Sequence, residues 1–274
     1  MAFSAGRGQN AAMVGASLER VRAEGPLVHN ITNYVVMNTT ANALLAVGAS
    51  PVMAHSEREV EEMVGLARAL VLNIGTLDDA WVGAMLKAGR AARRRGIPVV
   101  LDPVGAGATS YRTETARRLL TEVSPTIVRG NASEIRALGG GAGATRGVDS
   151  VHATEESLEA ARHLSEVHGC VVSVSGATDV IVGSEGVARV RNGVPLMTKV
   201  TGMGCTASAL TGAFAAVTPS AFSAAAHAMV VLGVAGELAA EKAGGPGTFQ
   251  AALLDVLAAM RPDEVDGRAR LEAA

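Results

Sequence analysis

Aromatic residues and cysteine are scarce in this chain of 274 residues. Aromatics make up only 3% of it, so it lacks the stacking platforms that bind single-stranded nucleic acid. Its 24 Lys and Arg residues nearly balance 26 Asp and Glu residues, with no block of one sign. This balance argues against a nucleic acid or an anionic membrane as the main partner. Two distant cysteines, Cys170 and Cys205, and no recognisable signal peptide predict a cytoplasmic protein.

A membrane-spanning run of roughly 18 apolar residues is also missing. The nearest candidate, Ala207 to Ala240, is divided by Thr218-Pro219-Ser220. The hydrophobic content of 49% is enough for one large α/β domain with a substantial core. Because no linker or internal repeat divides the chain, we predict a single soluble domain over residues 1–274.

Short apolar segments alternate with helical segments along most of the chain. This alternation predicts an α/β fold with a largely parallel central sheet and helices on both faces. An antiparallel hairpin is expected over residues 179–191, and a capping box at Ser56 and Glu59 predicts the start of a helix over 57–68. The other expected strands are 27–31, 50–54, 69–74, 98–102, 126–129 and 170–174, and the C-terminal third is expected to be helical over 206–217, 220–241 and 246–260.

Polar residues follow several of these strands. Ligands of such sheets bind beyond the carboxyl ends of the strands, so these residues are the candidates for a site. Asp102 suits a magnesium or phosphate site, but it also suits a turn in which its side chain caps the next amides. Asn131 and Glu134 match a helix capping box, although a carboxylate there can also hold a magnesium-bound water. The candidates by position are Asn30, Asn33, Met53, Asn73, Asp102, residues 129–134, Ser175 and Gly176.

The run from Lys199 to Thr206 is the strongest functional signal. Gly202 and Gly204 permit a tight turn and let backbone amides approach a ligand closely. A helix beginning near Cys205 would present unpaired N–H groups and its dipole to an anion such as a transferred phosphate. We expect the helix terminus to lower the Cys205 pKa, which would make the thiol a modest base. The alternative is a glycine-rich turn with a buried cysteine.

Together these motifs resemble a known family. Asn131-x-x-Glu134, Asp102-Pro103 and Gly202-x-Gly204 before a helix resemble the ribokinase superfamily, most of whose members place Asp where this chain has Cys205. With the cysteine, the chain closely resembles the hydroxyethylthiazole kinase family of thiamine salvage over roughly residues 10–260. Met203 and the glycine-rich stretch at 139–143 fit that pattern less well. The segments that carry the resemblance are 28–33, 48–54, 72–77, 101–109 and 245–250.

The resemblance implies a three-layer ribokinase-like fold and magnesium-dependent phosphorylation, by ATP, of the hydroxyl of 4-methyl-5-(2-hydroxyethyl)thiazole. It further implies a homotrimer whose substrate pocket is shared between subunits. The implied roles are Cys205 as the catalytic residue; Met53, Gly202 and Asn33 for the thiazole; Arg129, Ser175, Gly204 and Asn131 for ATP; and Asp102 and Glu134 for magnesium.

Two other classes of enzyme remain open from the sequence. Another small-alcohol kinase of the same superfamily would share the fold and the glycine motif, although Cys205 argues against most of these. A nucleotide-binding oxidoreductase is disfavoured because no Gly-x-Gly-x-x-Gly follows the first strand. A non-enzymatic ligand carrier is disfavoured by the carboxylate pair beside an anion-binding turn.

Overall fold

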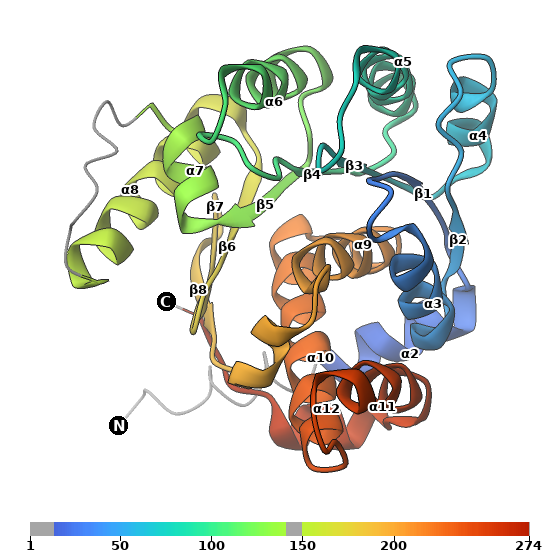
Figure 1. The fold of residues 1–274 in the computed structure, drawn as a ribbon, viewed down its shortest axis with the longest axis vertical. Helices are drawn as coiled ribbons and strands as arrows, with labels where there is room; N and C mark the ends of the chain where they lie inside the picture. Colours follow the sequence, from blue (N-terminus) through green and yellow to red (C-terminus); the bar gives the residue numbers. More distant parts are fainter. Residues whose placement is uncertain (1–13, 141–149, 274) are drawn as a thin grey trace.

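The computed structural model describes residues 14–140 and 150–273, which form an α/β fold around one mixed sheet. The strand order is β2-β1-β3-β4-β5-β6-β7-β8-β9. Pairing is parallel from β2 to β6 and antiparallel from β6 to β9 (Figure 1), which confirms the largely parallel sheet. The strands are β1 (Leu27–Ile31), β2 (Ser50–Val52), β3 (Ala69–Asn73), β4 (Val99–Asp102), β5 (Ile127–Asn131), β6 (Val171–Ser175), β7 (Asp179–Gly183), β8 (Gly186–Val190) and β9 (Leu271–Ala273).

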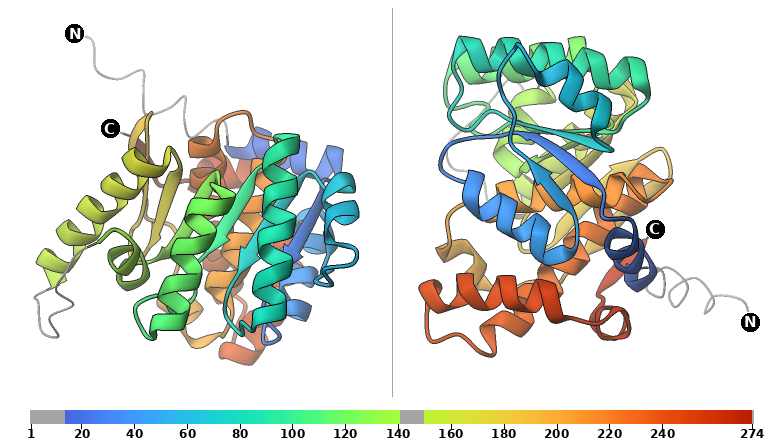
Figure 2. Two further views of the ribbon diagram at one scale, coloured as in Figure 1. Left: turned by 90° about the horizontal axis from the view of Figure 1, so that it is seen from above. Right: turned by 90° about the vertical axis from the view of Figure 1, so that its right-hand side faces the viewer.

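Helices cover both faces of the sheet, as expected (Figures 1 and 2). One face carries α4 (Val60–Leu66), α5 (Asp79–Arg95), α6 (Ser110–Val123), α7 (Ala132–Leu138) and α8 (Ser150–His168). The other carries α2 (Val14–Glu24), α3 (Met37–Val47), α9 (Met203–Ala215) and α10 (Ala221–Ala240), with α11 (Pro246–Ala259) and α12 (Pro262–Arg268) packed outside them. A short 3-10 helix, η1 (Pro195–Lys199), precedes α9.

The central strands are mostly apolar because both of their faces are buried, and polar residues occur chiefly toward their carboxyl ends. Along β3, Leu70 and Leu72 pack into the core beneath α4–α6, whereas Ala69 and Val71 pack into the core beneath α9 and α10. Successive side chains of a strand point to opposite faces, so a strand covered on both sides reads as a continuous apolar run. That is why these strands were predictable.

Helix α10 is a core helix. It is the one helix within the described ranges that is long and apolar enough to cross a membrane, yet 78% of its apolar window is buried inside the molecule. The break at Thr218 to Ser220 separates it from α9 as expected, and the Ser220 side chain caps its first turn.

The structure differs from the sequence-based expectations at several element ends. The capping box expected at Ser56 does not form: helix α4 begins only at Val60 and has no side-chain cap, while the Ser56 hydroxyl accepts from the Arg58 amide. The elements η1, α12 and β9 were not anticipated, and β9 completes the sheet beside β8. Of the glycine-rich loop expected at 139–143, residues 141–143 lie outside the described residues.

Candidate active site

The predicted site residues gather at the carboxyl edge of the parallel strands, where the first turn of α9 meets the sheet. Two adjoining cavities lie there, of about 340 and 730 Å³. Arg129, Ser175, Gly202 and Gly204 line both cavities. The smaller cavity is also lined by Asn33, Asp102, Asn131, Glu134 and Cys205, so every residue to which the family resemblance assigns a role, except Met53, lies on its wall. Of the other candidates, Gly176 lines the larger cavity, and Asn30 and Asn73 line neither.

Gly202 turns the chain into α9. Its φ of 82° lies in the left-handed region, and a Cβ built on it would stand 2.7 Å from Val36 Cγ1. Glycine is therefore required both by the backbone conformation and by the close approach of Val36. The helix begins at Met203, earlier than the predicted start near Cys205, and no side chain caps its first turn. Its first N–H groups are thus open to an anion in the cavity.

A chain of buried hydrogen bonds joins the strand ends to α9. Asn33 Nδ2 donates to Asn73 Oδ1 at 2.8 Å, and Asn73 Nδ2 donates to Asp102 Oδ2 at 2.7 Å. Ser208 Oγ, on the second turn of α9, also donates to Asp102 Oδ2 at 2.7 Å. Asn33 Nδ2 lies 3.5 Å from Cys205 Sγ, so the thiol is oriented by the same chain.

Asp102 does not cap the turn that follows it, so that alternative from the sequence is wrong. Its carboxylate is only 3% exposed and bonds to Asn73 and Ser208 instead. Burial raises the Asp102 pKa to about 6, and the positive charge of Arg129 opposes that rise.

Burial likewise raises the pKa of the Cys205 thiol, to about 11, and the negative charge of Asp102 adds to the effect. This corrects the expectation that the helix terminus would lower the pKa. The thiol is therefore neutral at pH 7 in the free protein.

Arg129 connects the two cavities. Its side chain is 5% exposed, and its Nη1 donates to the Gly204 carbonyl at 2.9 Å, which fixes it beside the start of α9. Its Nε is buried without a hydrogen-bond partner in the described structure. A buried guanidinium with a free donor suits an anionic ligand such as a nucleotide phosphate.

Glu134 has a structural role in which each of its two carboxylate oxygens accepts a hydrogen bond from a backbone amide. Oε2 accepts from the Asn131 amide and Oε1 from the Gly105 amide, each at 2.8 Å, while the Asn131 side chain accepts from the Glu134 amide. The capping box expected from the sequence is thus formed at the start of α7. It also fixes the turn after β4 beside β5.

Asp102 and Glu134 fit a magnesium site of the kind that relies on few protein ligands. Both line the smaller cavity, and the negative charge of Glu134 helps to raise the Asp102 pKa, a repulsion that a cation between them would relieve. The hydrogen bonds to Asp102 from the described side chains end on Oδ2, which leaves Oδ1 for a ligand. No cluster of three or more His, Cys, Asp or Glu side chains that could hold a metal occurs in the described residues. Magnesium commonly uses one or two carboxylates together with water and substrate phosphates.

Met53 lies apart from these residues within a single chain. It follows the edge strand β2, is half-buried, and lines neither cavity. Its segment is held by His29, whose Nε2 lies 2.7 Å from the Ala54 carbonyl oxygen. His29 is a buried, hydrogen-bonded histidine, as its place in an apolar strand predicts, and burial lowers its pKa.

Sequence reasoning missed three parts of the site. Ser208 stands one helical turn after Gly204, and this spacing from the glycine motif was the available signal. Asp179 lines the larger cavity, but its position in a hairpin gave no sign of this. The segment 192–198 also lines that cavity and carries no recognisable motif.

Comparison with known proteins decides the family. A family model described as "Hydroxyethylthiazole kinase family" matches residues 18–263. The chain belongs to the hydroxyethylthiazole kinase family. It is 57% identical over 259 residues to the hydroxyethylthiazole kinase of Syntrophus aciditrophicus, covering 94% of this chain and 96% of the relative. It is 54% identical over 267 residues to that of Leptothrix cholodnii, covering 96% and 95%.

Solved structures agree with this membership. A hydroxyethylthiazole kinase protein from Pyrococcus horikoshii OT3 matches with a TM-score of 0.88 and 44% identity, covering 96% of this chain and 99% of that one. A pyridoxal kinase from Staphylococcus aureus in complex with AMP-PCP and pyridoxal matches at 15% identity and a TM-score of 0.59, covering 78% and 88%. The second likeness concerns the fold alone. The expected family, kinase class and ribokinase-like fold are confirmed, and the oxidoreductase alternative is set aside.

The geometry at the start of α9 predicts different outcomes for alanine at its two glycines. Gly202→Ala should lower stability by roughly 1–2 kcal/mol, because alanine disfavours the left-handed region, and the clash with Val36 should add to that loss. Gly204→Ala should cost little, since Gly204 is helical and a Cβ built on it would lie 3.6 Å from Arg129 Nη1, an ordinary contact distance. Urea denaturation of both variants measures the difference. Equal losses of stability would contradict the assigned role of Gly202.

Proposed function

We propose that the protein transfers the γ-phosphate of ATP to the hydroxyl of 4-methyl-5-(2-hydroxyethyl)thiazole. The observation that carries the proposal is the pair of adjoining cavities that meet at Arg129 and the uncapped first turn of α9. A phosphoryl donor in one cavity and an alcohol in the other would place the transferred group at that junction. Membership of the hydroxyethylthiazole kinase family supports the choice of alcohol.

The nucleotide is assigned to the larger cavity. Val194, Met197 and Leu232 give it an apolar lining suited to a base. The phosphates would then reach Arg129, Ser175 and the amides after Gly202. Phosphoryl transfer has a loose transition state, so catalysis depends on positioning and on donors aimed at the phosphate oxygens. The free Nε of Arg129 and the first N–H groups of α9 are such donors.

Magnesium is assigned to Asp102 and Glu134. The bound cation would neutralise charge on the phosphate oxygens. Asn73 from the sheet and Ser208 from α9 both donate to Asp102 Oδ2, which holds the carboxylate in a fixed orientation. The Glu134 carboxylate is fixed by two backbone amides.

Cys205 is proposed as the residue that accepts the proton of the attacking alcohol. Asn33 orients its sulfur at the wall of the smaller cavity. Because burial and Asp102 raise its pKa to about 11, only a small fraction is thiolate at neutral pH. The thiolate is the form that accepts the proton, so its small population limits the catalysis at neutral pH, and no phosphocysteine is required.

A homotrimer with a shared substrate pocket would account for the position of Met53. In one chain Met53 lies outside the smaller cavity, so its proposed contact with the thiazole would come from a neighbouring subunit. Tyr34 and Val35 beside that cavity are 64% and 63% exposed, which suits a surface covered in an assembly. Val36, in contrast, is buried against Gly202 within the chain.

Activity is the direct test of this function. Purified protein should convert hydroxyethylthiazole to its phosphate with ATP, and EDTA should abolish the reaction until magnesium is restored, because the carboxylate pair needs a cation to receive phosphate. Phosphorylated product measured by chromatography gives the rate. Phosphorylation of hydroxymethylpyrimidine or ribose, with none of the thiazole, would defeat the proposal.

Substitution of Cys205 tests its role. Cys205→Asp should keep much of the activity, since a carboxylate at that position can also accept the proton. Cys205→Ala should lose about 10²-fold in turnover, the low end for a general base, with ATP affinity nearly unchanged because the phosphate-binding amides remain. Turnover is measured at saturating ATP and thiazole.

The turnover of the wild type and that of the Cys205→Asp variant should also differ in pH dependence. A group with pKa about 11 gains its basic form as pH rises, so the wild-type rate should climb between pH 7 and 9. A carboxyl has a much lower intrinsic pKa than a thiol, so the aspartate variant should be ionised over this range even though the same surroundings raise its pKa, and its profile should be flatter. Wild-type turnover in the alanine variant would make Cys205 a packing residue only.

The assembly is tested by light scattering on the active protein. We expect the mass of a trimer, and Met53→Ala should raise the KM for the thiazole more than the KM for ATP. A monomer with full activity would remove both the trimer and the shared pocket.

A further inference from the structure

The outer wall of the larger cavity is an irregular segment held in place by α10. Residues 192–198, which leave β8 and pass through the first residues of η1, contribute six of the cavity-lining positions: Asn192, Gly193, Val194, Pro195, Met197 and Thr198. We call this segment the strap. It has no sheet partner of its own, so its position depends on what anchors it to the body of the protein.

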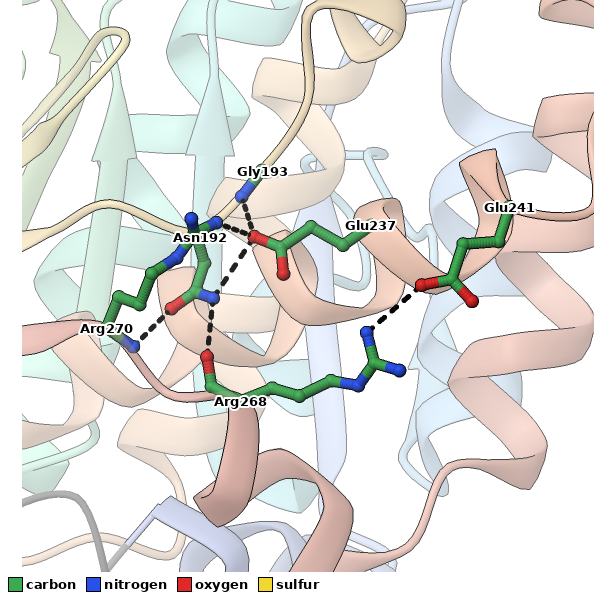
Figure 3. A network of polar contacts seen from close by, with 6 residues as sticks. All are labelled: Asn192, Gly193, Glu237, Glu241, Arg268 and Arg270. Carbon is green, nitrogen blue, oxygen red and sulfur yellow. Dashed lines mark hydrogen bonds and ion pairs between the residues drawn. The ribbon is translucent and has the colours of Figure 1, made fainter.

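Glu237 of α10 is the central anchor (Figure 3). Its Oε1 accepts from the Gly193 amide at 2.7 Å and from Asn192 Nδ2 at 3.2 Å. The Arg270 guanidinium pairs with the same oxygen. The Glu237 side chain is only 17% exposed, so its bonds to the strap are partly shielded from water, whereas the Arg270 side chain is 54% exposed.

Asn192 ties the strap to the C-terminal segment as well. Its Nδ2 donates to the Arg268 carbonyl at 2.9 Å, and its Oδ1 accepts from the Arg270 amide at 2.8 Å. The side-chain amide thus joins the strap, α10 and the approach to β9. Because Asn192 is buried, each of these bonds would be costly to leave unmade.

Close packing against glycines of α10 completes the anchor. A Cβ on Gly233 would lie 2.5 Å from Asn192 Cβ, and one on Gly236 would lie 2.6 Å from Met197 Sδ. Gly233, Gly236 and Glu237 follow one another at helical spacing, so one face of α10 receives the strap. Gly193 itself has a φ of 119°, a conformation that side-chain-bearing residues rarely adopt.

We infer that Glu237 is a positioning residue for nucleotide binding: it holds the strap against α10 and so preforms the outer wall of the larger cavity. It touches neither reacting group, and it acts through Gly193 and Asn192. The inference rests on the proposed function, which assigns the nucleotide to this cavity. Nucleotide affinity would then depend on the contacts that Glu237, which lies outside the cavity itself, makes with Gly193 and Asn192.

The test compares two carboxylates that each pair with an arginine of the C-terminal segment: Glu237 in α10 and Glu241 at the C-cap of that helix. Glu237→Ala should raise the KM for ATP by roughly tenfold, the size expected for loss of a charge-assisted hydrogen bond, while kcat and the KM for the thiazole change less than twofold. Glu241→Ala is the matched control, because Glu241 pairs with Arg268 without contacting the strap. It should leave all three constants unchanged.

Two further variants separate positioning from general stability. Glu237→Gln retains an oxygen that can accept from Gly193, so its KM for ATP should lie between those of the wild type and Glu237→Ala. Gly193→Ala leaves the pair of Glu237 and Arg270 in place but strains the strap, and it should also raise the KM for ATP. If Glu237→Ala does not fold, these two variants decide the matter. Lower thermal stability with an unchanged KM for ATP, or an equal rise of both KM values, would overturn the inference.

ADP binding measured by calorimetry distinguishes this inference from the proposed function. If the wild type binds ADP but does not phosphorylate the thiazole, only the proposed function is overturned. Weaker ADP binding by Glu237→Ala would then still support the positioning role of Glu237. Equal ADP affinity in the wild type and in Glu237→Ala would overturn only the positioning role of Glu237. Wild type that does not bind ADP overturns the assignment of the cavity and the inference with it.

Discussion

The site depends on the hydrogen bonds and the positive charge that surround the buried carboxylate of Asp102. Burying an ionised group is costly unless it is paired and hydrogen-bonded, and here burial raises its pKa to about 6. The partners that offset this cost come from three different elements: Asn73 at the end of β3, Ser208 on α9 and the charge of Arg129 from β5. The same carboxylate therefore fixes the start of α9 against the edge of the sheet.

The approach of α9 to the sheet makes this arrangement possible. A Cβ on Gly212 would lie 2.7 Å from Val71 Cγ2 and 3.2 Å from Val28 Cγ1, so the helix lies closer to β1 and β3 than a larger residue would permit. Its first turn consequently reaches the carboxyl edge, where Gly202 redirects the chain. Both cavities are lined by that turn and by Arg129.

Much of the fold was predictable because its signals are local. A strand buried on both faces is mostly a continuous apolar run, and Gly48 after α3 is a glycine C-cap in the left-handed conformation, which is a local signal too. The capping box at Asn131 was also correctly predicted, since both of its partners lie within one turn. The box at Ser56 was wrong, because helix α4 begins one turn later than its capping signal.

The rest of the site depends on contacts between distant parts of the chain. The bond from Ser208 to Asp102 spans 106 residues, and the bond from Arg270 to Asn192 spans 78, so no short motif encodes either. The Cys205 pKa shows the same limit. Its position at a helix terminus predicts a lowered value, whereas its burial beside Asp102, which only the fold creates, raises it.

The charges around the smaller cavity explain why a cation belongs to the proposed chemistry. The charged side chains on its wall are Asp102, Glu134 and Arg129, and the thiol of Cys205 is neutral. Two carboxylates against one guanidinium leave an excess of negative charge when Asp102 is ionised, which would repel the phosphates of a nucleotide. The donors that oppose this repulsion are the N–H groups of α9 and the Nε of Arg129. A site built in this way favours phosphate that arrives with a divalent cation.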